Sequence, residues 1–106
     1  MTSARSKKPS SGKRPKQPVH VLFDLAGRRW TLRAIWELRD GTLGFRALRE
    51  ACGDASPTVL SKRLSELRDA GLVKSDGGSY SLTGSGSELA AALSGLDRVA
   101  GNIFGF

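Results

Sequence analysis

The sequence predicts a mainly α-helical fold of the α+β class, in which a short β-hairpin interrupts a series of helices. Apolar residues recur at the spacing of amphipathic helices from Val19 onward. The pair Ser56-Pro57 combines a hydroxyl cap with a first-turn proline, which is typical of a helix start. An aspartate and two glycines separate two short alternating runs, which indicates a hairpin turn. One domain accounts for most of the 106-residue chain.

The first 18 residues differ in composition from the rest of the chain. They hold three prolines, no acidic residue and six of the seven formal net positive charges. Nothing in them offsets the entropy of ordering, so we expect a disordered basic arm over residues 1–18 and a folded domain over residues 19–106. The arm is either a solvated tail or an electrostatic arm along nucleic-acid phosphates. Its cations are Arg5, Lys7, Lys8, Lys13, Arg14 and Lys16.

Composition also excludes several functional classes. The single cysteine, Cys52, cannot form an internal disulfide, which suits a reducing compartment. The single histidine, His20, has no metal-ligand partner at a recognisable spacing, and no nucleophile, base and orienting group occur together. The apolar stretches are too short to span a bilayer. We expect a cytoplasmic protein with no metal, no cofactor, no membrane partner and no enzymatic activity.

Three short helices are expected in the first half of the domain. The first covers residues 19–26 and ends at Gly27, where a C-terminal cap is typical. The second covers residues 30–39 and ends at an Asp-Gly turn pair, and the third covers residues 45–52. The expected core residues among them include Trp30, Trp36, Phe45, Leu48 and an inert Cys52, whereas Arg46, Arg49 and Glu50 are expected to face water.

The fourth helix is the most clearly marked element. It begins at Pro57 and stops at Gly71, so we expect it over residues 57–70. At about 100° per residue, leucines gather on one side and short polar side chains on the other. Arg63 lies between these faces, where it either contacts a phosphate or pairs with a carboxylate such as Asp24. The core side holds Leu60, Leu64 and Leu67, and the polar side holds Thr58, Ser61, Lys62 and Ser65.

The chain after Gly71 predicts a hairpin and a terminal helix. Two short runs, residues 72–74 and 80–82, alternate apolar and polar residues and are joined through residues 75–79. From about Ser85, apolar residues recur at alternating steps of four and three, a spacing that suits packing on a partner helix. This stripe contains Leu89, Leu93, Leu96, Ala100 and Ile103.

Helix, turn, polar-faced helix and hairpin together make a winged helix-turn-helix, here with a short two-stranded wing and a C-terminal dimerisation helix. A helix of about 10 to 12 Å diameter fits the major groove of B-DNA when its outward side chains are short and polar. The expected partner is therefore double-stranded DNA.

The residues also resemble a family over about residues 17–96. The matching residues are Pro18-Val19, residues 24–32 with the pattern Gly-x-x-Trp-Thr-Leu, Phe45 and Leu48, residues 56–67, residues 70–73, and residues 80–83 with Gly86 and Leu89. In these residues the chain is similar to the HxlR-type winged helix-turn-helix transcriptional regulators of prokaryotes, which are distant relatives of the MarR-type regulators. The resemblance implies a DNA-binding regulator that acts as a dimer.

Two departures from the family pattern bear on function. Gln17 stands where the family typically has a cysteine that senses oxidants or electrophiles in some members, so redox sensing at that position is not implied. The segment between Val73 and Tyr80 is shorter than the wing of the family, and Lys74 is its only cation. This short wing argues against extensive contact between the wing and DNA.

Taken together, these features predict a sequence-specific, nucleoid-associated transcriptional regulator that acts as a homodimer. Two alternatives stay open: a winged-helix module that binds proteins, and an architectural protein that binds DNA nonspecifically through the basic arm. The predicted DNA contacts are Ser56, Thr58, Ser61, Lys62, Arg63, Ser65 and Lys74. The predicted dimer contacts are Leu89, Leu93 and Leu96.

Overall fold

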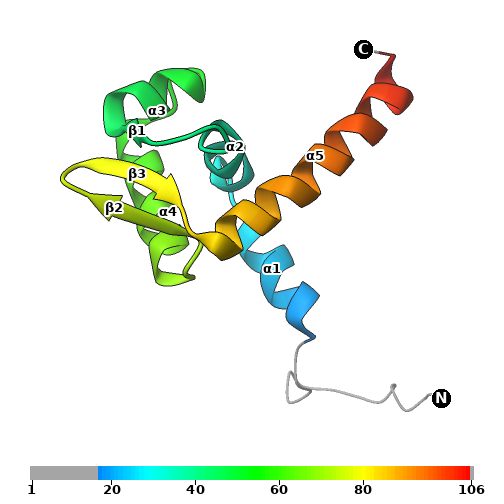
Figure 1. Cartoon of the computed structure of the whole chain (residues 1–106), viewed down its shortest axis with the longest axis horizontal. Helices are drawn as coiled ribbons and strands as arrows, with labels where there is room; N and C mark the ends of the chain where they lie inside the picture. Colours follow the sequence, from blue (N-terminus) through cyan, green and yellow to red (C-terminus); the bar gives the residue numbers. More distant parts are fainter. Residues whose placement is uncertain (1–16, 106) are drawn as a thin grey trace.

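The computed structural model describes residues 17–105 and arranges them as a winged helix-turn-helix. The wing points away from one side of the core, and the C-terminal helix extends from the other (Figure 1). The helices are α1 (Pro18–Ala26), α2 (Thr31–Glu37), α3 (Phe45–Ala51), α4 (Pro57–Asp69) and α5 (Gly84–Phe104), and the strands are β1 (Leu43–Gly44), β2 (Val73–Asp76) and β3 (Ser79–Leu82). The predicted fold class is confirmed.

The boundaries of the first two helices differ slightly from the expected ones. Helix α1 begins at Pro18, because proline is well suited to the first helical position. Helix α2 begins one residue later than expected, at Thr31, because Trp30 adopts a left-handed conformation with φ of 74°. Trp30 therefore turns the chain from α1 into α2, and its indole packs partly against the core.

Local signals explain the boundaries of α4. The Ser56 hydroxyl accepts a hydrogen bond from the Val59 backbone N–H at 3.4 Å, as expected of an N-terminal cap. Gly71 follows the helix with φ of 78°, a conformation that favours glycine and ends the helix. The three leucines of the expected core side are buried, so the predicted orientation of α4 is confirmed.

The sheet has three antiparallel strands in the order β1-β3-β2. Val73 pairs with Leu82 and Asp76 with Ser79, which leaves only Gly77 and Gly78 in the turn. Both glycines have positive φ, as a tight two-residue hairpin turn requires, so the strands extend into the expected connection. Strand β1 was not predicted; its two residues pair with the far side of β3.

The core lies where α2, α3 and α4 meet the base of the wing and the first turns of α5. Ile35 and Leu48 are fully buried there with the leucines of α4. Val73 brings β2 into this core, and Ala90 brings in α5. Cys52 is fully buried at the end of α3, in agreement with the expected structural thiol.

The start of α5 is fastened to the end of α4. The Thr83 hydroxyl donates a hydrogen bond to the Gly71 carbonyl at 2.6 Å and accepts one from the Gly86 backbone N–H at 3.1 Å. The Thr83 backbone N–H also bonds to the Leu72 carbonyl at 3.1 Å. Three contacts within a few residues therefore set the direction in which α5 leaves the core.

Candidate nucleic-acid interface

The polar face of α4 is exposed along its length. Its four predicted side chains, Thr58, Ser61, Lys62 and Ser65, all lie on the exposed side of the helix. The opposite side is held by buried leucines, of which Leu60 and Leu67 are fully buried. Because burial of one side fixes the rotation of the helix about its axis, the short polar side chains must point to solvent.

The turn between α3 and α4 is held by an arginine that we expected to face water. The Arg49 Nε donates a hydrogen bond to the Ala55 carbonyl at 2.7 Å, and Arg49 is half-buried. Within the same turn, Gly53 and Asp54 both have positive φ. The expected exposure of Arg49 was wrong, because a backbone carbonyl that follows the turn comes within reach of its guanidinium.

Arg63 is held in an ion-pair network and is not freely exposed. Its Nε donates to the Arg29 carbonyl at 2.9 Å, and its guanidinium donates to the Glu66 carboxylate at 2.9 Å. The Arg28 guanidinium lies 3.2 Å from the other oxygen of Glu66. Of the two predicted roles for Arg63, the structure shows pairing with a carboxylate, and that carboxylate belongs to Glu66.

The charge state of Glu66 follows from its two partners. Partial burial raises the pKa of Glu66, but the hydrogen bonds from Arg63 and Arg28 and the charges of both groups outweigh this effect. The pKa of Glu66 therefore lies below its ordinary value, and the side chain is ionised at neutral pH. This network was not predicted from the sequence, although the spacing of three between Arg63 and Glu66 was a signal for a pair on one helix.

The wing presents little charge. Lys74 is exposed on β2, where its register partner is Ser81. The tip consists of Gly77 and Gly78, which have no side chain with which to contact a groove. The predicted phosphate contact at Lys74 thus lies on a different element from the polar face of α4. The predicted arm contacts, residues 5–16, lie outside the described residues.

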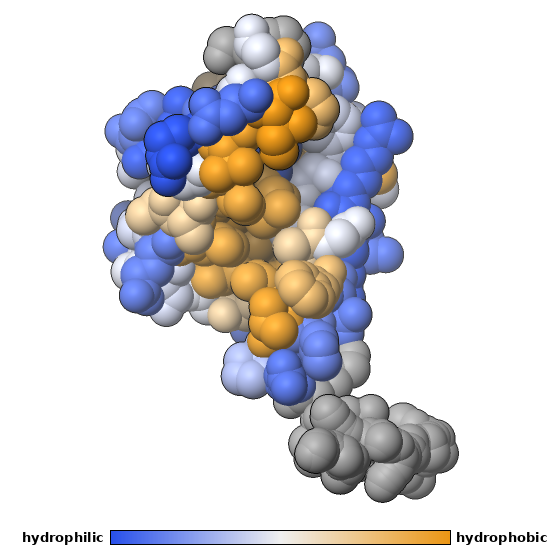
Figure 2. All heavy atoms as spheres, turned by 90° about the vertical axis from the view of Figure 1, so that its right-hand side faces the viewer, coloured by the Kyte–Doolittle hydropathy of each residue, from blue (hydrophilic) through white to orange (hydrophobic). Residues whose placement is uncertain are grey.

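A separate apolar surface runs over α1 and α5. Figure 2 shows apolar side chains gathered along the face that these helices form. The exposed large apolar residues of the described chain all belong to these two helices, and they are Val19, Val21, Phe23, Leu96, Val99, Ile103 and Phe104. Leu89 and Leu93 of the predicted dimer stripe instead pack partly against their own core, whereas Leu96 is 61% exposed.

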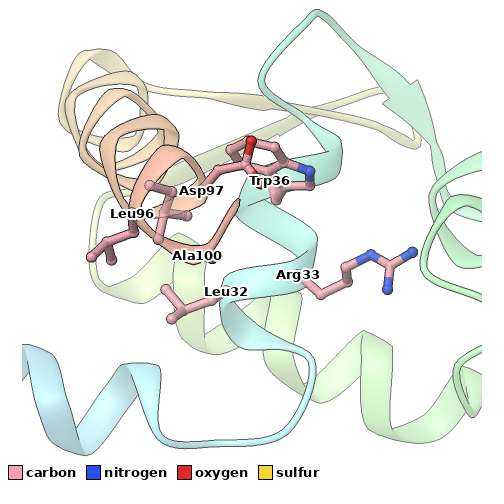
Figure 3. Close-up of a pocket in the computed structure, with 7 residues that line it drawn as sticks. Leu32, Arg33, Trp36, Leu96, Asp97 and Ala100 are labelled. Carbon is pink, nitrogen blue, oxygen red and sulfur yellow. The ribbon is translucent and has the colours of Figure 1, made fainter. Parts of the chain in front are cut away.

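A groove of about 380 Å³ lies between α2 and α5 and shares Leu96 with this surface. Leu32 and Trp36 of α2 and Leu96 and Ala100 of α5 surround the same space (Figure 3). Arg33 also lines the groove, but its guanidinium points away from the groove and donates to the Ala51 carbonyl at 2.9 Å. Trp36 was expected in the core, but it is half-buried and forms one wall of the groove.

The described part of the chain shows no other chemistry-bearing cluster. Among residues 17–105, no group of three His, Cys, Asp or Glu side chains could hold a metal ion. None of the described helices is long and apolar enough to cross a membrane. Burial raises the pKa of the Cys52 thiol. The positive charge of Arg33 lowers this pKa, but it offsets only part of the increase.

Comparison with known protein families shows to which family this chain belongs. The sequence profile of the HxlR-like helix-turn-helix proteins matches residues 25–104. The chain belongs to the HxlR-like helix-turn-helix family. These proteins are transcriptional regulators and not enzymes, which confirms the predicted resemblance and the predicted absence of enzymatic activity.

Two curated relatives of this HxlR-like protein are helix-turn-helix-type transcriptional regulators. One, from Methanocaldococcus jannaschii, is 32% identical over 72 residues, which cover 63% of this chain and 67% of the relative. The other, YvaP from Bacillus subtilis, is 33% identical over 84 residues, which cover 73% of this chain and 78% of YvaP.

Solved structures show the same architecture. Quinone-bound YodB from Bacillus subtilis matches with a TM-score of 0.74 and 30% identity over 79% of this chain and 96% of YodB. A possible HxlR family transcriptional factor from Thermoplasma volcanium matches with a TM-score of 0.73 and 27% identity over 86% of this chain and 88% of its own. The HxlR-like protein therefore shares both sequence and fold with bacterial and archaeal regulators.

Proposed function

We propose that this HxlR-like protein is a cytoplasmic, sequence-specific regulator of transcription that places α4 in the major groove of double-stranded DNA. The exposed polar face of α4, opposite fully buried leucines, carries this proposal. Its side chains are short enough to let the helix approach base edges, and serine, threonine and lysine all form hydrogen bonds with them. Family membership supports the same role.

In the proposed complex with DNA, base contacts, phosphate contacts and positioning of α4 would fall to different residues. Thr58, Ser61, Lys62 and Ser65 would contact base edges, while Ser56 would contact DNA at the N-terminus of α4. Lys74 would contact a phosphate from the wing, and the cations among residues 1–18 would add sequence-independent attraction. Arg63 would position α4 through its hydrogen bond to the Arg29 carbonyl, and Glu66 would hold the Arg63 guanidinium in place.

A homodimer accounts for the apolar surface of α1 and α5. Phe23 on α1 and Leu96 on α5 are 60% and 61% exposed, and monomeric soluble proteins rarely expose large contiguous apolar patches. A second copy packed on these helices by a two-fold axis would bury the surface. It would also present two copies of α4 to successive major grooves, about 34 Å apart.

Selection of binding sites from a pool of random duplexes tests this proposal. We expect enrichment of a short inverted repeat whose half-sites lie one helical turn apart. Binding without any enriched sequence would support the nonspecific architectural role, and a lack of DNA affinity at low salt would support the protein-interaction role. Either of these results would overturn the proposal.

A further inference from the structure

Glu66 lies at one edge of the polar face of α4. It lies one turn after Lys62, which places the two side chains about 40° apart around the helix axis. A helix in the major groove is flanked by a sugar-phosphate backbone on each side. The edge of the polar face that carries Glu66 is therefore an edge that would face phosphates in the proposed complex.

At this edge a carboxylate holds two guanidinium groups. One oxygen of Glu66 contacts Arg63 at 2.9 Å, and the other contacts Arg28 at 3.2 Å. A phosphate would accept the same donors, because carboxylate and phosphate oxygens both suit the planar fork of arginine. In the free protein, Glu66 thus pairs with two guanidinium groups that could otherwise bind phosphates of the DNA backbone.

The two arginines differ in how firmly they are held. The Arg63 side chain is 16% exposed and is fixed at two points, by the Arg29 carbonyl and by Glu66. The Arg28 side chain is 44% exposed, and it contacts Glu66 at the longer distance of 3.2 Å. Its backbone is ordered on both sides, since its N–H bonds to the Leu25 carbonyl and its carbonyl accepts from the Thr31 N–H. Only the Arg28 side chain has to move to exchange partners.

We propose that Arg28 binds a DNA phosphate in the complex and that Glu66 competes with the phosphate for it in the free protein. Glu66 would then weaken DNA binding, while its contact with Arg63 holds the Arg63 side chain beside the Arg29 carbonyl. The inference rests on the proposed function, since it concerns the same DNA complex. It adds a phosphate-binding residue outside α4 and the wing, and an internal carboxylate that sets the affinity.

The experiment uses the full chain and a random-sequence duplex of fixed length, because phosphate contacts carry no sequence information. Affinity is measured by fluorescence anisotropy over a range of salt concentrations. Glu66→Gln keeps a hydrogen-bond acceptor for Arg63 and removes the charge. We expect this variant to bind several-fold more tightly. Arg28→Gln should bind more weakly, and its log-log salt slope should be smaller by about 0.9, the value for one lost phosphate contact.

The double variant and a control separate exchange from simple charge repulsion. In the Arg28→Gln background, Glu66→Gln should give little further gain, because the competition no longer exists. Glu88→Gln removes an exposed acid from α5, away from the polar face of α4, and reports the general effect of charge. An equal gain from Glu66→Gln with and without Arg28 would overturn the inference, and so would a gain no larger than that of Glu88→Gln.

The two proposals fail in distinguishable ways. If the unaltered chain binds no duplex at low salt, both the proposed function and this inference fail. If it binds, but Arg28→Gln keeps the full affinity and salt slope, only the inference fails. Circular dichroism spectra and melting curves of each variant show that the fold is retained, and Arg28→Gln leaves the contact between Arg63 and Glu66 in place.

Discussion

Gly86 of α5 lies directly against the carbonyl group of Leu72. A Cβ atom at position 86 would stand 2.0 Å from the Leu72 carbonyl oxygen, closer than any side chain can approach backbone. The contact lies where the wing, the end of α4 and the start of α5 meet, beside the Thr83 cap. The absence of a side chain at Gly86 is therefore what lets α5 leave the core in its observed direction.

Gly86→Ala should consequently destabilise the fold or displace α5. Overpacking against a rigid partner typically costs about 1 to 3 kcal/mol, and here the partner is backbone. Gly95→Ala is the matched control in the same helix, because a Cβ atom there meets nothing within 4 Å. It should be neutral or stabilising by up to about 1 kcal/mol. Chemical denaturation of both variants measures the difference, and equal stabilities would contradict the close contact.

The two faces of α4 should respond differently to truncation. Lys62→Ala and Ser65→Ala alter exposed side chains, so they should reduce affinity for a selected binding site with little change in melting temperature. Leu64→Ala removes a buried side chain and should cost about 2 to 5 kcal/mol of unfolding free energy. Binding titrations and thermal melts test this pair of effects. If both exposed variants bound normally, the proposed groove face would be wrong.

Assembly should depend on the exposed end of the leucine stripe. Leu96→Asp places a charge on the apolar surface of α5 without disturbing the core, so it should yield folded monomers with weakened DNA binding. Leu93 is less suitable, because it packs partly against its own protomer. Asn102→Asp adds the same charge elsewhere on α5 and should remain dimeric. Light scattering at micromolar concentration gives the mass, and a monomeric unaltered chain would refute the proposed dimer.

The Cys52 thiol should be unreactive in the folded protein. It is fully buried, and burial raises its pKa, so little reactive thiolate is available at neutral pH. Ellman's reagent should therefore modify native protein slowly, at a rate limited by unfolding, and denatured protein within seconds. Rapid modification of the native chain would contradict the buried, inert thiol.

The Glu66 network should make stability depend on pH in the acid range. Its pKa is lowered in the folded state, so its contribution is present above the ordinary glutamate value of about 4.3 and is lost as pH falls through the folded value. Glu66→Gln should melt below the unaltered chain at pH 7, and the difference should shrink as the pH is lowered toward about 3. Glu88→Gln, at an exposed position on α5, is the comparison. A difference that stays constant over this range would rule out the ionic contribution.

The elements that the sequence determined by itself are those whose signals are local. Ser56, Pro57 and Gly71 lie next to the helix that they bound, and the leucine spacing determines which side of α4 is buried. The two glycines of the wing likewise specify a tight turn without help from distant residues. A cap, a period and a turn each act over a few residues, so these features can be recognised before any tertiary contact is known.

Tertiary structure decided the features that join distant segments. Strand β1 exists only because Leu43 meets Tyr80 across the sheet. Arg49 and Arg63 find their backbone acceptors only after the chain has turned, at Ala55 and at Arg29. The sequence spacing predicted the leucine stripe of α5. Which of its leucines pack against their own core depends on the direction in which Gly86 allows the helix to leave the core. Such contacts depend on the relative positions of whole elements, which no local pattern specifies.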